Sequence, residues 1–560
     1  MKKILILLTL SVGFSGEINL SQFSPGFREN GLIKTWVYFQ DKMGSPIIAL
    51  DEMRKNQRQA VGLSSEPTFY DQKISPNYMH QLNELGINII HQSRWLNAVS
   101  VLVTPAELNQ LNNLVFVKKI EPVYFYHREK LGLSGEVAQP NSSRDDSLDY
   151  GYAQDQIEQI NVHMAHQNGY YGQGIRVLVM DTGFDLSHSV FDSLTLIAQH
   201  DFINDDNFTG NETDDENYYN QDFHGTAVLS VMAGNQPGSL IGPAFKSEYL
   251  LAKTEMVEQE IQGEEDNYVA GLEWGEENGA QVVSTSLGYL DWYTYEDLDG
   301  NTAVTTNAID IAVGLGLTCV TAAGNEGNSS WYYIISPADA DSVIAVGAVN
   351  VNDVLATFSS HGPTFDGRIK PEVCARGVST WGIDPGTNGY RTLNGTSLAT
   401  PLVGGAVAVI KSAHPDWAPM TLRSALLMSA DNHSNPNNSY GYGIIDTWGA
   451  INFPISSTDG FVHPSGFNLL SNYPNPFNPI TTIRFDLVET WHVGNPAVSG
   501  ATSLRIFDIT GRVVDVLVNG NLNPGQHEIQ WNASQNGSGI YFVQLQTENR
   551  SITNKMIYLK

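Results

Sequence analysis

The chain has 560 residues, more than one ordinary domain accommodates, so we expect roughly two to four domains. Hydrophobic residues make up 41 % of it and charged residues 16 %, which is typical of globular proteins and not of disordered ones. The formal net charge of −30 argues against binding to nucleic acid or docking on anionic lipid, because both require a basic surface.

Residues 1–15 have the pattern of a signal peptide. Lys2 and Lys3 precede an apolar run, and Gly13 and Ser15 suit a small-residue cleavage site. We therefore predict export of the chain, with cleavage after Ser15. No other apolar run approaches the length that spans a bilayer, so no transmembrane segment is expected.

The chain has two cysteines, Cys319 and Cys374. Export permits a disulfide between them. Both lie in apolar, strand-like contexts, however, so we favour two buried free thiols over a bridge.

Residues 32–120 alternate strand-like and helical segments in the order β-α-β-β-α-β, the split βαβ arrangement of a small ferredoxin-like α+β domain. Ser75 is expected as an N-cap, with Pro76 as the first helical residue. Thr104 and Glu107 form a capping box that predicts the start of the second helix. The predicted strands lie at residues 36–40, 87–92, 99–103 and 114–120.

Two polar stretches are expected to be linkers. Residues 128–149 are rich in Ser, Gly and Asp and predict an exposed segment open to proteolytic nicking, and residues 454–466 predict a second linker. The resulting domains are an N-terminal domain (16–127), a central domain (150–453) and a C-terminal domain (467–560).

The central domain alternates apolar strand runs with helical patterns. Runs that are apolar throughout, between helices, indicate a parallel sheet covered on both faces, so we predict a doubly wound α/β domain. These runs lie at residues 174–183, 280–288, 317–325 and 342–349.

The C-terminal domain consists of short alternating segments separated by turn signals. This spacing is typical of an all-β sandwich of about seven strands. The predicted strands lie at residues 480–487, 502–509, 511–518, 527–531, 539–547 and 555–559.

Three polar residues of the central domain lie at element boundaries in the order Asp181, His224, Ser397. Each alone has a structural explanation: a turn after a strand, a hydrogen-bonded structural histidine and a helix cap. Together they fit nucleophilic catalysis, because a serine hydroxyl is a poor nucleophile unless an adjacent base takes its proton.

Residues 150–453 resemble the subtilisin-family (subtilase) serine proteases. The motifs that carry this resemblance lie at residues 177–188, 224–234, 284–288, 322–327 and 394–408. The chain order Asp, His, Ser is also the order in subtilisin.

The resemblance implies a role for each site residue. Ser397 is the expected nucleophile, His224 the general base and acid, and Asp181 the carboxylate that orients the histidine. Asn325 matches the side-chain donor of the oxyanion hole, although a Gly-Asn pair is also ordinary turn chemistry. The fold implied is a subtilisin-like doubly wound parallel sheet.

Two substrate-binding strips are also implied by the resemblance. One resembles the strand that pairs with extended substrate, and the other resembles a wall of the S1 pocket. They comprise Ser286, Leu287, Gly288, Ala322, Ala323 and Gly324. Ile335 is expected at the base of that pocket, where it would narrow specificity.

No cofactor is expected for catalysis. Subtilases often bind structural calcium, and the acidic segments 204–222 and 297–301 are candidates, since calcium takes several oxygen ligands. Neither segment has EF-hand spacing, so a solvated acidic loop is an equal alternative and no metal ligands are assigned.

The flanking domains resemble known accessory domains. The N-terminal domain resembles the inhibitor-type propeptide of subtilases, which would cover the active site, assist folding and be released near residues 128–150. The alternative is a permanent partner or substrate domain. The C-terminal domain resembles the sorting domain of type IX secretion, which implies the secretion machinery as a partner; a carbohydrate- or protein-binding sandwich is the alternative.

The sequence thus predicts a secreted or cell-surface serine endopeptidase that is made as an autoprocessed zymogen and cleaves proteins or peptides through an acyl-enzyme. A catalytically inactive subtilase that serves as a surface adhesion or binding protein is the alternative.

Overall fold

The computed structural model divides into two compact units, Met1–Phe453 and Pro454–Lys560. The predicted signal peptide, most of the 128–149 linker and nearly all of the 454–466 linker lie outside the described residues. The structure describes residues 20, 23, 31–123, 125–127, 136–139, 148–257, 259–261, 263–454, 468–469, 477–487, 501–509, 511–521, 525–546 and 551–560.

The N-terminal domain is built on a four-stranded antiparallel sheet with strand order β2-β3-β1-β4. The predicted order β-α-β-β-α-β is present, with one additional helix, α1, that we did not predict. Alternate residues of β1 and β3, such as Val37 and its partner Val99, pack with α2 and α3 in one core. The elements are β1 (Ile33–Phe39), α1 (Glu52–Ala60), η2 (Phe69–Asp71), α2 (Pro76–Glu84), β2 (Asn88–Ser93), β3 (Ala98–Val103), α3 (Pro105–Asn112) and β4 (Val117–Pro122).

The two predicted helix starts differ in how they are capped. The capping box of α3 is confirmed: the Thr104 hydroxyl accepts from the Glu107 N–H, and the Glu107 carboxylate accepts from the Thr104 N–H at 2.7 Å. Ser75 is the N-cap residue of α2 by position, but the prediction that its side chain caps the helix is wrong. Its hydroxyl donates instead to the Met43 carbonyl at 2.8 Å.

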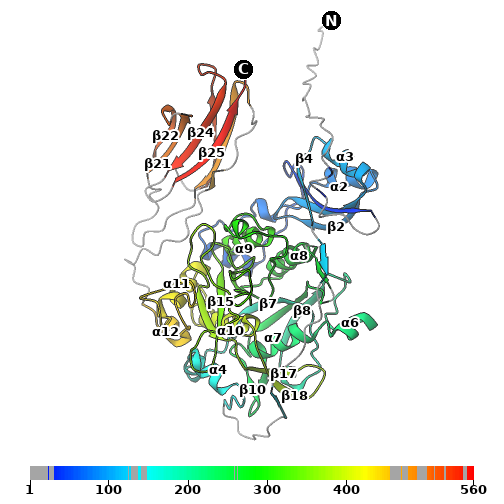
Figure 1. Ribbon diagram of the computed structural model, residues 1–560, viewed down its shortest axis with the longest axis vertical. Coiled ribbons are helices and arrows are strands. Elements are labelled where there is room, and N and C mark those ends of the chain that lie inside the picture. Colours follow the sequence, from blue (N-terminus) through cyan, green and yellow to red (C-terminus); the bar gives the residue numbers. More distant parts are fainter. Residues whose placement is uncertain are drawn as a thin grey trace. The chain divides into compact units, whose positions relative to one another are not determined.

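The central domain is built on a seven-stranded sheet in which every neighbouring pair is parallel, with the order β16-β15-β14-β13-β7-β11-β8 (Figure 1). The strands are β7 (Arg176–Asp181), β8 (Thr195–Asp201), β11 (Glu248–Lys253), β13 (Val282–Thr285), β14 (Thr318–Ala322), β15 (Ile344–Val349) and β16 (Val373–Arg376). The helices are α4 (Gln154–Gln159), α5 (Val162–Gln167), α6 (Asp214–Tyr219), α7 (Phe223–Ala233), α8 (Gly263–Glu277), α9 (Val304–Gly314), α10 (Thr396–Ala413), α11 (Pro419–Ser429) and α12 (Thr447–Ile451).

Both faces of this sheet are buried, which explains why its strands are apolar throughout. On β7, Val177 and Val179 join the core that contains α7 and α10, whereas Leu178 and Met180 join the core that contains α8 and α9. The arrangement is the predicted doubly wound fold.

The two cysteines are buried free thiols, as we favoured. Cys319 lies in the core on the α8 side of the sheet and Cys374 in the core on the α10 side. Burial raises the pKa of both thiols.

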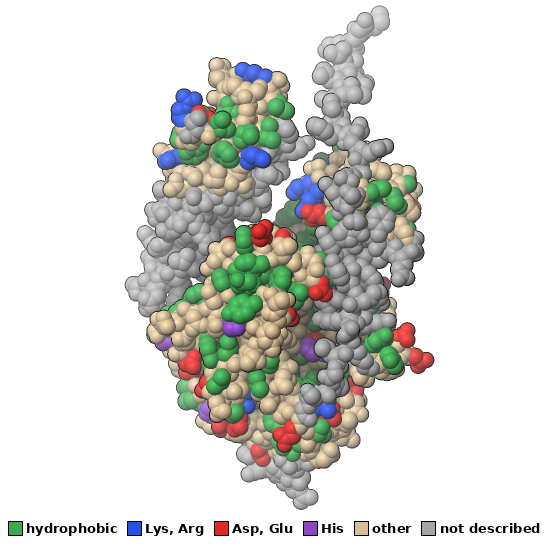
Figure 2. Space-filling view, viewed as in Figure 1, with side chains coloured by type: hydrophobic (Ala, Val, Ile, Leu, Met, Phe, Trp, Pro, Cys, Tyr) green, Lys and Arg blue, Asp and Glu red, His purple; other side chains and the backbone are tan. Residues whose placement is uncertain are grey.

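Helix α10 is the one helix in the described part of the chain that is long and apolar enough to cross a membrane. Most of it is buried against the sheet, as expected of the core helix of a globular domain. Figure 2 shows acidic side chains spread over the central domain and few basic ones, in keeping with the net charge.

The C-terminal domain contains two antiparallel sheets with the orders β19-β20-β23 and β22-β21-β24-β25, which together give the predicted sandwich. Its core includes Phe485 and Trp531 from one sheet and Ile506 and Val543 from the other. The strands are β19 (Asn468–Leu469), β20 (Ile480–Leu487), β21 (Ala501–Asp508), β22 (Val513–Asn521), β23 (Gly525–Asn532), β24 (Gly539–Gln546) and β25 (Ser551–Tyr558).

Helix α10 lies so close to β13 and α7 that Gly404 has no room for a side chain. A Cβ there would lie 2.8 Å from Ser284 Oγ and 2.9 Å from Met232 Cε. We expect Gly404→Val to lower the free energy of unfolding of the central domain by about 3 kcal/mol, measured by thermal denaturation in a Ser397→Ala background. Gly314→Ala is the control, since a Cβ there meets no atom within 4 Å. An equal effect of both substitutions would contradict this packing.

Candidate active site

Asp181 is the last residue of β7 and is fully buried. Its Oδ1 accepts from the Thr182 N–H at 2.8 Å and lies 2.7 Å from His224 Nδ1. A carboxylate in this position favours the imidazole tautomer that carries its proton on Nδ1.

His224 lies in the first turn of α7, and its side chain is 36 % exposed. The next residue, Gly225, permits the close approach of α7 to the turn after β7. A Cβ at Gly225 would lie 2.3 Å from the Gly183 carbonyl oxygen and 2.9 Å from Asp181 Cβ. The Asp181–His224 hydrogen bond therefore depends on a glycine at this position.

Ser397 is the second residue of α10 and is 9 % exposed. The N-cap position belongs to Gly395, so the alternative in which Ser397 caps the helix is wrong. Gly395 has φ of 145°, which L side chains rarely adopt, and its Cβ position lies 3.2 Å from Ser397 Oγ. A bare backbone therefore lies beside the serine hydroxyl.

Asn325 follows β14 and is exposed. Its Oδ1 accepts from the Thr396 N–H at 2.9 Å and from the Thr396 hydroxyl at 3.1 Å. Because the amide oxygen is held in this way, the Nδ2 group is directed to donate elsewhere. Sequence reasoning missed the part played by Thr396; a hydroxyl residue directly before the proposed nucleophile was the available signal.

The strip that follows β13 is joined to the start of α10. The Ser286 hydroxyl donates to the Ser397 carbonyl oxygen at 2.8 Å. Ser286 and Leu287 are buried, and Gly288 is half-buried.

The strip 322–324 lies at the end of β14, where Ala322, Ala323 and Gly324 are buried. Ile335 lies against both strips: Cβ positions on Gly288 and Gly324 would lie 2.5 Å and 3.1 Å from its side-chain carbons. The Ile335 N–H also donates to the Ala323 carbonyl at 3.2 Å.

A further strand against the central domain was not predicted. β5 (Phe125–His127) pairs antiparallel with β12 (Gln259–Ile261), so the end of the N-terminal domain adds a strand to the central domain.

Two residues before His224, burial raises the pKa of the Asp222 carboxyl, and the nearby Asp185 carboxylate adds to this shift.

Two carboxylates at the acidic loop after β8 are paired with a lysine of β11. Asp201 and Glu216 bind the buried ammonium of Lys253, and these bonds raise its pKa although burial opposes them. Carboxylate oxygens of Asp201, Asp206 and Glu212 lie within 4.8 Å of one another, but both Asp201 oxygens already accept hydrogen bonds. Calcium binding at this group stays a prediction.

The candidate segment 297–301 uses its carboxylates locally. Asp297 closes a capping box with Thr294, and Asp299 accepts from the N–H groups of Asn301 and Thr302. No calcium site is assigned there.

The comparison with protein families agrees with this geometry. Residues 172–443 match the model described as the subtilase family. The chain is 31 % identical to subtilisin E of Bacillus subtilis (strain 168) over 371 residues, which cover 66 % of this chain and 84 % of that protein. The chain belongs to the subtilase family. It is a subtilisin-like serine protease.

Other relatives support the same conclusion. Subtilisin of Bacillus pumilus is 34 % identical over 306 residues, covering 54 % of this chain and 98 % of that protein. An alkaline protease of Shouchella clausii is 27 % identical over 392 residues, covering 70 % of this chain and 88 % of that protein.

The flanking domains of this subtilase also match family models. Residues 34–136 match a peptidase S8 propeptide domain of Bacteroidota, and residues 471–559 match a secretion system C-terminal sorting domain. The C-terminal domain is therefore a type IX sorting domain, and the protease is exported for secretion or attachment to the cell surface.

The Ser286 hydrogen bond links a substrate strip to the first turn of α10. We expect Ser286→Ala to destabilise the central domain by about 1 kcal/mol, because a buried hydrogen bond is lost, and to lower kcat more than it raises KM. Thermal denaturation and steady-state kinetics measure the two effects. Ser412→Ala, at the far end of α10, is the control. Unchanged stability and kcat in Ser286→Ala would contradict the link.

Proposed function

We propose that this subtilase is a serine endopeptidase that acts through Ser397, His224 and Asp181. His224 Nε2 takes the proton of the Ser397 hydroxyl while Oγ forms a bond to the scissile carbonyl carbon. The same proton then passes to the leaving amine, and water hydrolyses the acyl-enzyme by the reverse route. The observation that carries the proposal is the 2.7 Å contact between buried Asp181 and His224.

The developing oxyanion would be stabilised by two kinds of donor. The Nδ2 group of Asn325 is one, because Thr396 holds its amide oxygen away. Backbone N–H groups at the start of α10 are the other, and the positive end of the helix dipole adds to them. The alternative of an inactive adhesion protein is not favoured, because the residues that it would have lost are present.

We also propose that the protease is made as a zymogen. The pairing of β5 with β12 supports a propeptide whose end lies along the central domain as an added strand, in the manner of a bound peptide. Cleavage within residues 128–149 by the enzyme itself would then release the N-terminal domain. The natural partners are protein or peptide substrates, the propeptide as inhibitor and the type IX secretion machinery.

The first test is Ser397→Ala. We expect this variant to keep its propeptide covalently attached and to bind no fluorophosphonate probe, because it lacks the nucleophilic oxygen. Wild type and the matched variant Ser412→Ala, a serine of the same helix, should mature and react with the probe. Maturation of isolated Ser397→Ala would contradict autoprocessing, and an unlabelled, correctly folded wild type would contradict the proposed nucleophile.

For specificity, we propose that Ile335 restricts the S1 pocket to small P1 side chains. Its side chain lies between the strips 286–288 and 322–324, in the space that a larger P1 residue would need. Exclusion of a larger P1 side chain by Ile335 would be steric.

Shortening Ile335 tests this. We expect Ile335→Gly to raise kcat/KM for P1 phenylalanine by about 100-fold relative to P1 alanine, because a pocket discriminates by about 1–3 kcal/mol per methylene. Ile335→Val should give a smaller shift in the same direction. Profiling with a positional peptide library measures both. An unchanged P1 profile in Ile335→Gly would place the specificity determinant elsewhere.

A further inference from the structure

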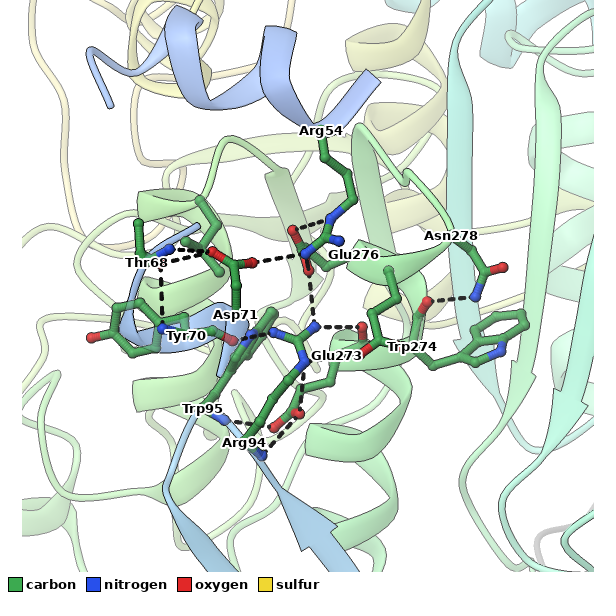
Figure 3. Close-up of polar contacts among 12 residues, drawn as sticks. Arg54, Thr68, Tyr70, Asp71, Arg94, Trp95, Glu273, Trp274, Glu276 and Asn278 are labelled. Atoms are coloured by element: carbon green, nitrogen blue, oxygen red, sulfur yellow. Dashed lines mark hydrogen bonds and ion pairs between the residues drawn. The ribbon is translucent and has the colours of Figure 1, made fainter. Parts of the chain in front are cut away.

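The additional helix α1 of the N-terminal domain docks on the central domain through arginines. Arg54, Arg58 and Arg94 are all at least nine-tenths buried, and all three bind the carboxylate of Glu276, which is itself 1 % exposed. Figure 3 shows Arg54 and Arg94 at this carboxylate. Arg54 and Arg58 lie one turn apart on α1, and Arg94 lies on the turn between β2 and β3.

Glu276 is fully engaged by these arginines. Its Oε1 accepts from Arg54 Nε at 2.9 Å and from an Arg58 terminal nitrogen at 2.7 Å. Its Oε2 accepts from terminal nitrogens of Arg54 at 2.8 Å and of Arg94 at 2.9 Å. The Arg54 contact is fork-shaped, with one nitrogen on each carboxylate oxygen. Arg58 and Arg94 each give one terminal nitrogen to Glu276 and use other nitrogens for further acceptors, the Leu315 carbonyl for Arg58 and Glu277 for Arg94. Lysine, with one nitrogen, does not provide this geometry.

Two further carboxylates of α8 complete the surface. Glu273 accepts from the Ser93 hydroxyl at 2.6 Å and from the Arg94 and Trp95 N–H groups at 3.1 Å, and Glu277 accepts from Arg94 Nε at 3.0 Å. We call Glu273, Glu276 and Glu277 the α8 carboxylate face.

This face is unfavourable for the helix that carries it. Glu273 lies three and four residues before Glu276 and Glu277, so their side chains share one side of the helix end. Glu276 and Glu277 lie in the last turn of α8, where the helix dipole also repels anions and no basic residue is present. A cation from another part of the fold relieves such a local conflict, and the N-terminal domain supplies three.

The polarity of the interface is uniform. In the described residues, every ion pair that joins the two domains has its cation on the N-terminal domain and its carboxylate on the central domain. Besides the pairs with Glu276 and Glu277, Lys34 pairs with Asp266 at 2.9 Å and Arg94 with Glu273 at 3.6 Å. Asp71 holds Arg54 and Arg58 in place from the N-terminal side.

We propose that the α8 carboxylate face is a guanidinium-selective docking site for this chain's own propeptide, and that it sets how long the cleaved propeptide stays bound. The proposal rests on the proposed zymogen maturation. Loss of Glu276 would leave three buried guanidinium groups with too few carboxylates, which is strongly unfavourable for the complex.

The main experiment uses the proteins that maturation itself produces. We expect Glu276→Gln to raise the dissociation constant of the cleaved propeptide by about 30-fold or more, measured as recovery of peptidase activity on dilution. Glu248→Gln is the matched control. It removes the same charge from the central domain, but in the described part of the chain the Glu248 side chain pairs with Arg176 of the same domain and not with the propeptide. Arg58→Lys should weaken the complex although it keeps the charge. If Glu276→Gln is cleaved normally and binds the cleaved propeptide as tightly as the wild type does, the proposal is overturned.

A second measurement needs no catalysis and separates this proposal from the proposed function. In uncut Ser397→Ala protein, adding Glu276→Gln should raise amide exchange in α1 by about 10-fold while α10 is unchanged. Equal protection of α1 in both proteins overturns the docking role even if no variant matures.

Competition on the wild-type protein requires no variant to fold. L-arginine should release the cleaved propeptide at lower concentration than L-lysine at equal ionic strength, and equal potency overturns guanidinium selectivity.

Discussion

The site depends on a carboxylate held at the buried end of a strand. Asp181 is buried at the end of a strand in a parallel sheet that is covered on both faces, and its Oδ1 accepts from the N–H of Thr182. The same oxygen lies against His224 Nδ1, and the histidine comes this close because Gly225 lets α7 approach the backbone after β7. Because packing already fixes the arrangement of these side chains in the folded protein, no free energy is spent on reorienting them during a reaction.

The remaining site residues are brought to the same edge by the same constraint. Parallel strands place their carboxyl ends together, so the segments after β13 and β14 reach the start of α10. Two hydrogen bonds then join them: Ser286 to the Ser397 carbonyl, and Thr396 to Asn325. A substrate strip, the expected oxyanion donor and the expected nucleophile are thus one connected unit.

The sequence predicted most of this because its signals are local. Apolar runs with flanking turn residues predicted β7, β13, β14 and β15 of the central sheet, but β8 and β11 were missed. The capping box at Thr104 predicted the start of α3. The missed features depend on partners distant in the sequence. α1 has a mostly polar sequence, and only the docked face of α8 explains why its arginines are buried. Likewise, Ser75 has an N-cap residue's identity and position, but the nearby Met43 carbonyl takes its hydroxyl.

By itself, the sequence determined the order of the domains and the fold class and predicted the candidate site residues, since strand periodicity and short motifs depend only on neighbouring residues. Tertiary structure alone decided which of these residues meet, that Gly395 rather than Ser397 is the N-cap of α10, that Ile335 lies between the two strips, and that Glu276 receives three arginines. These contacts join residues far apart in the chain, and only packing brings such residues within hydrogen-bond distance.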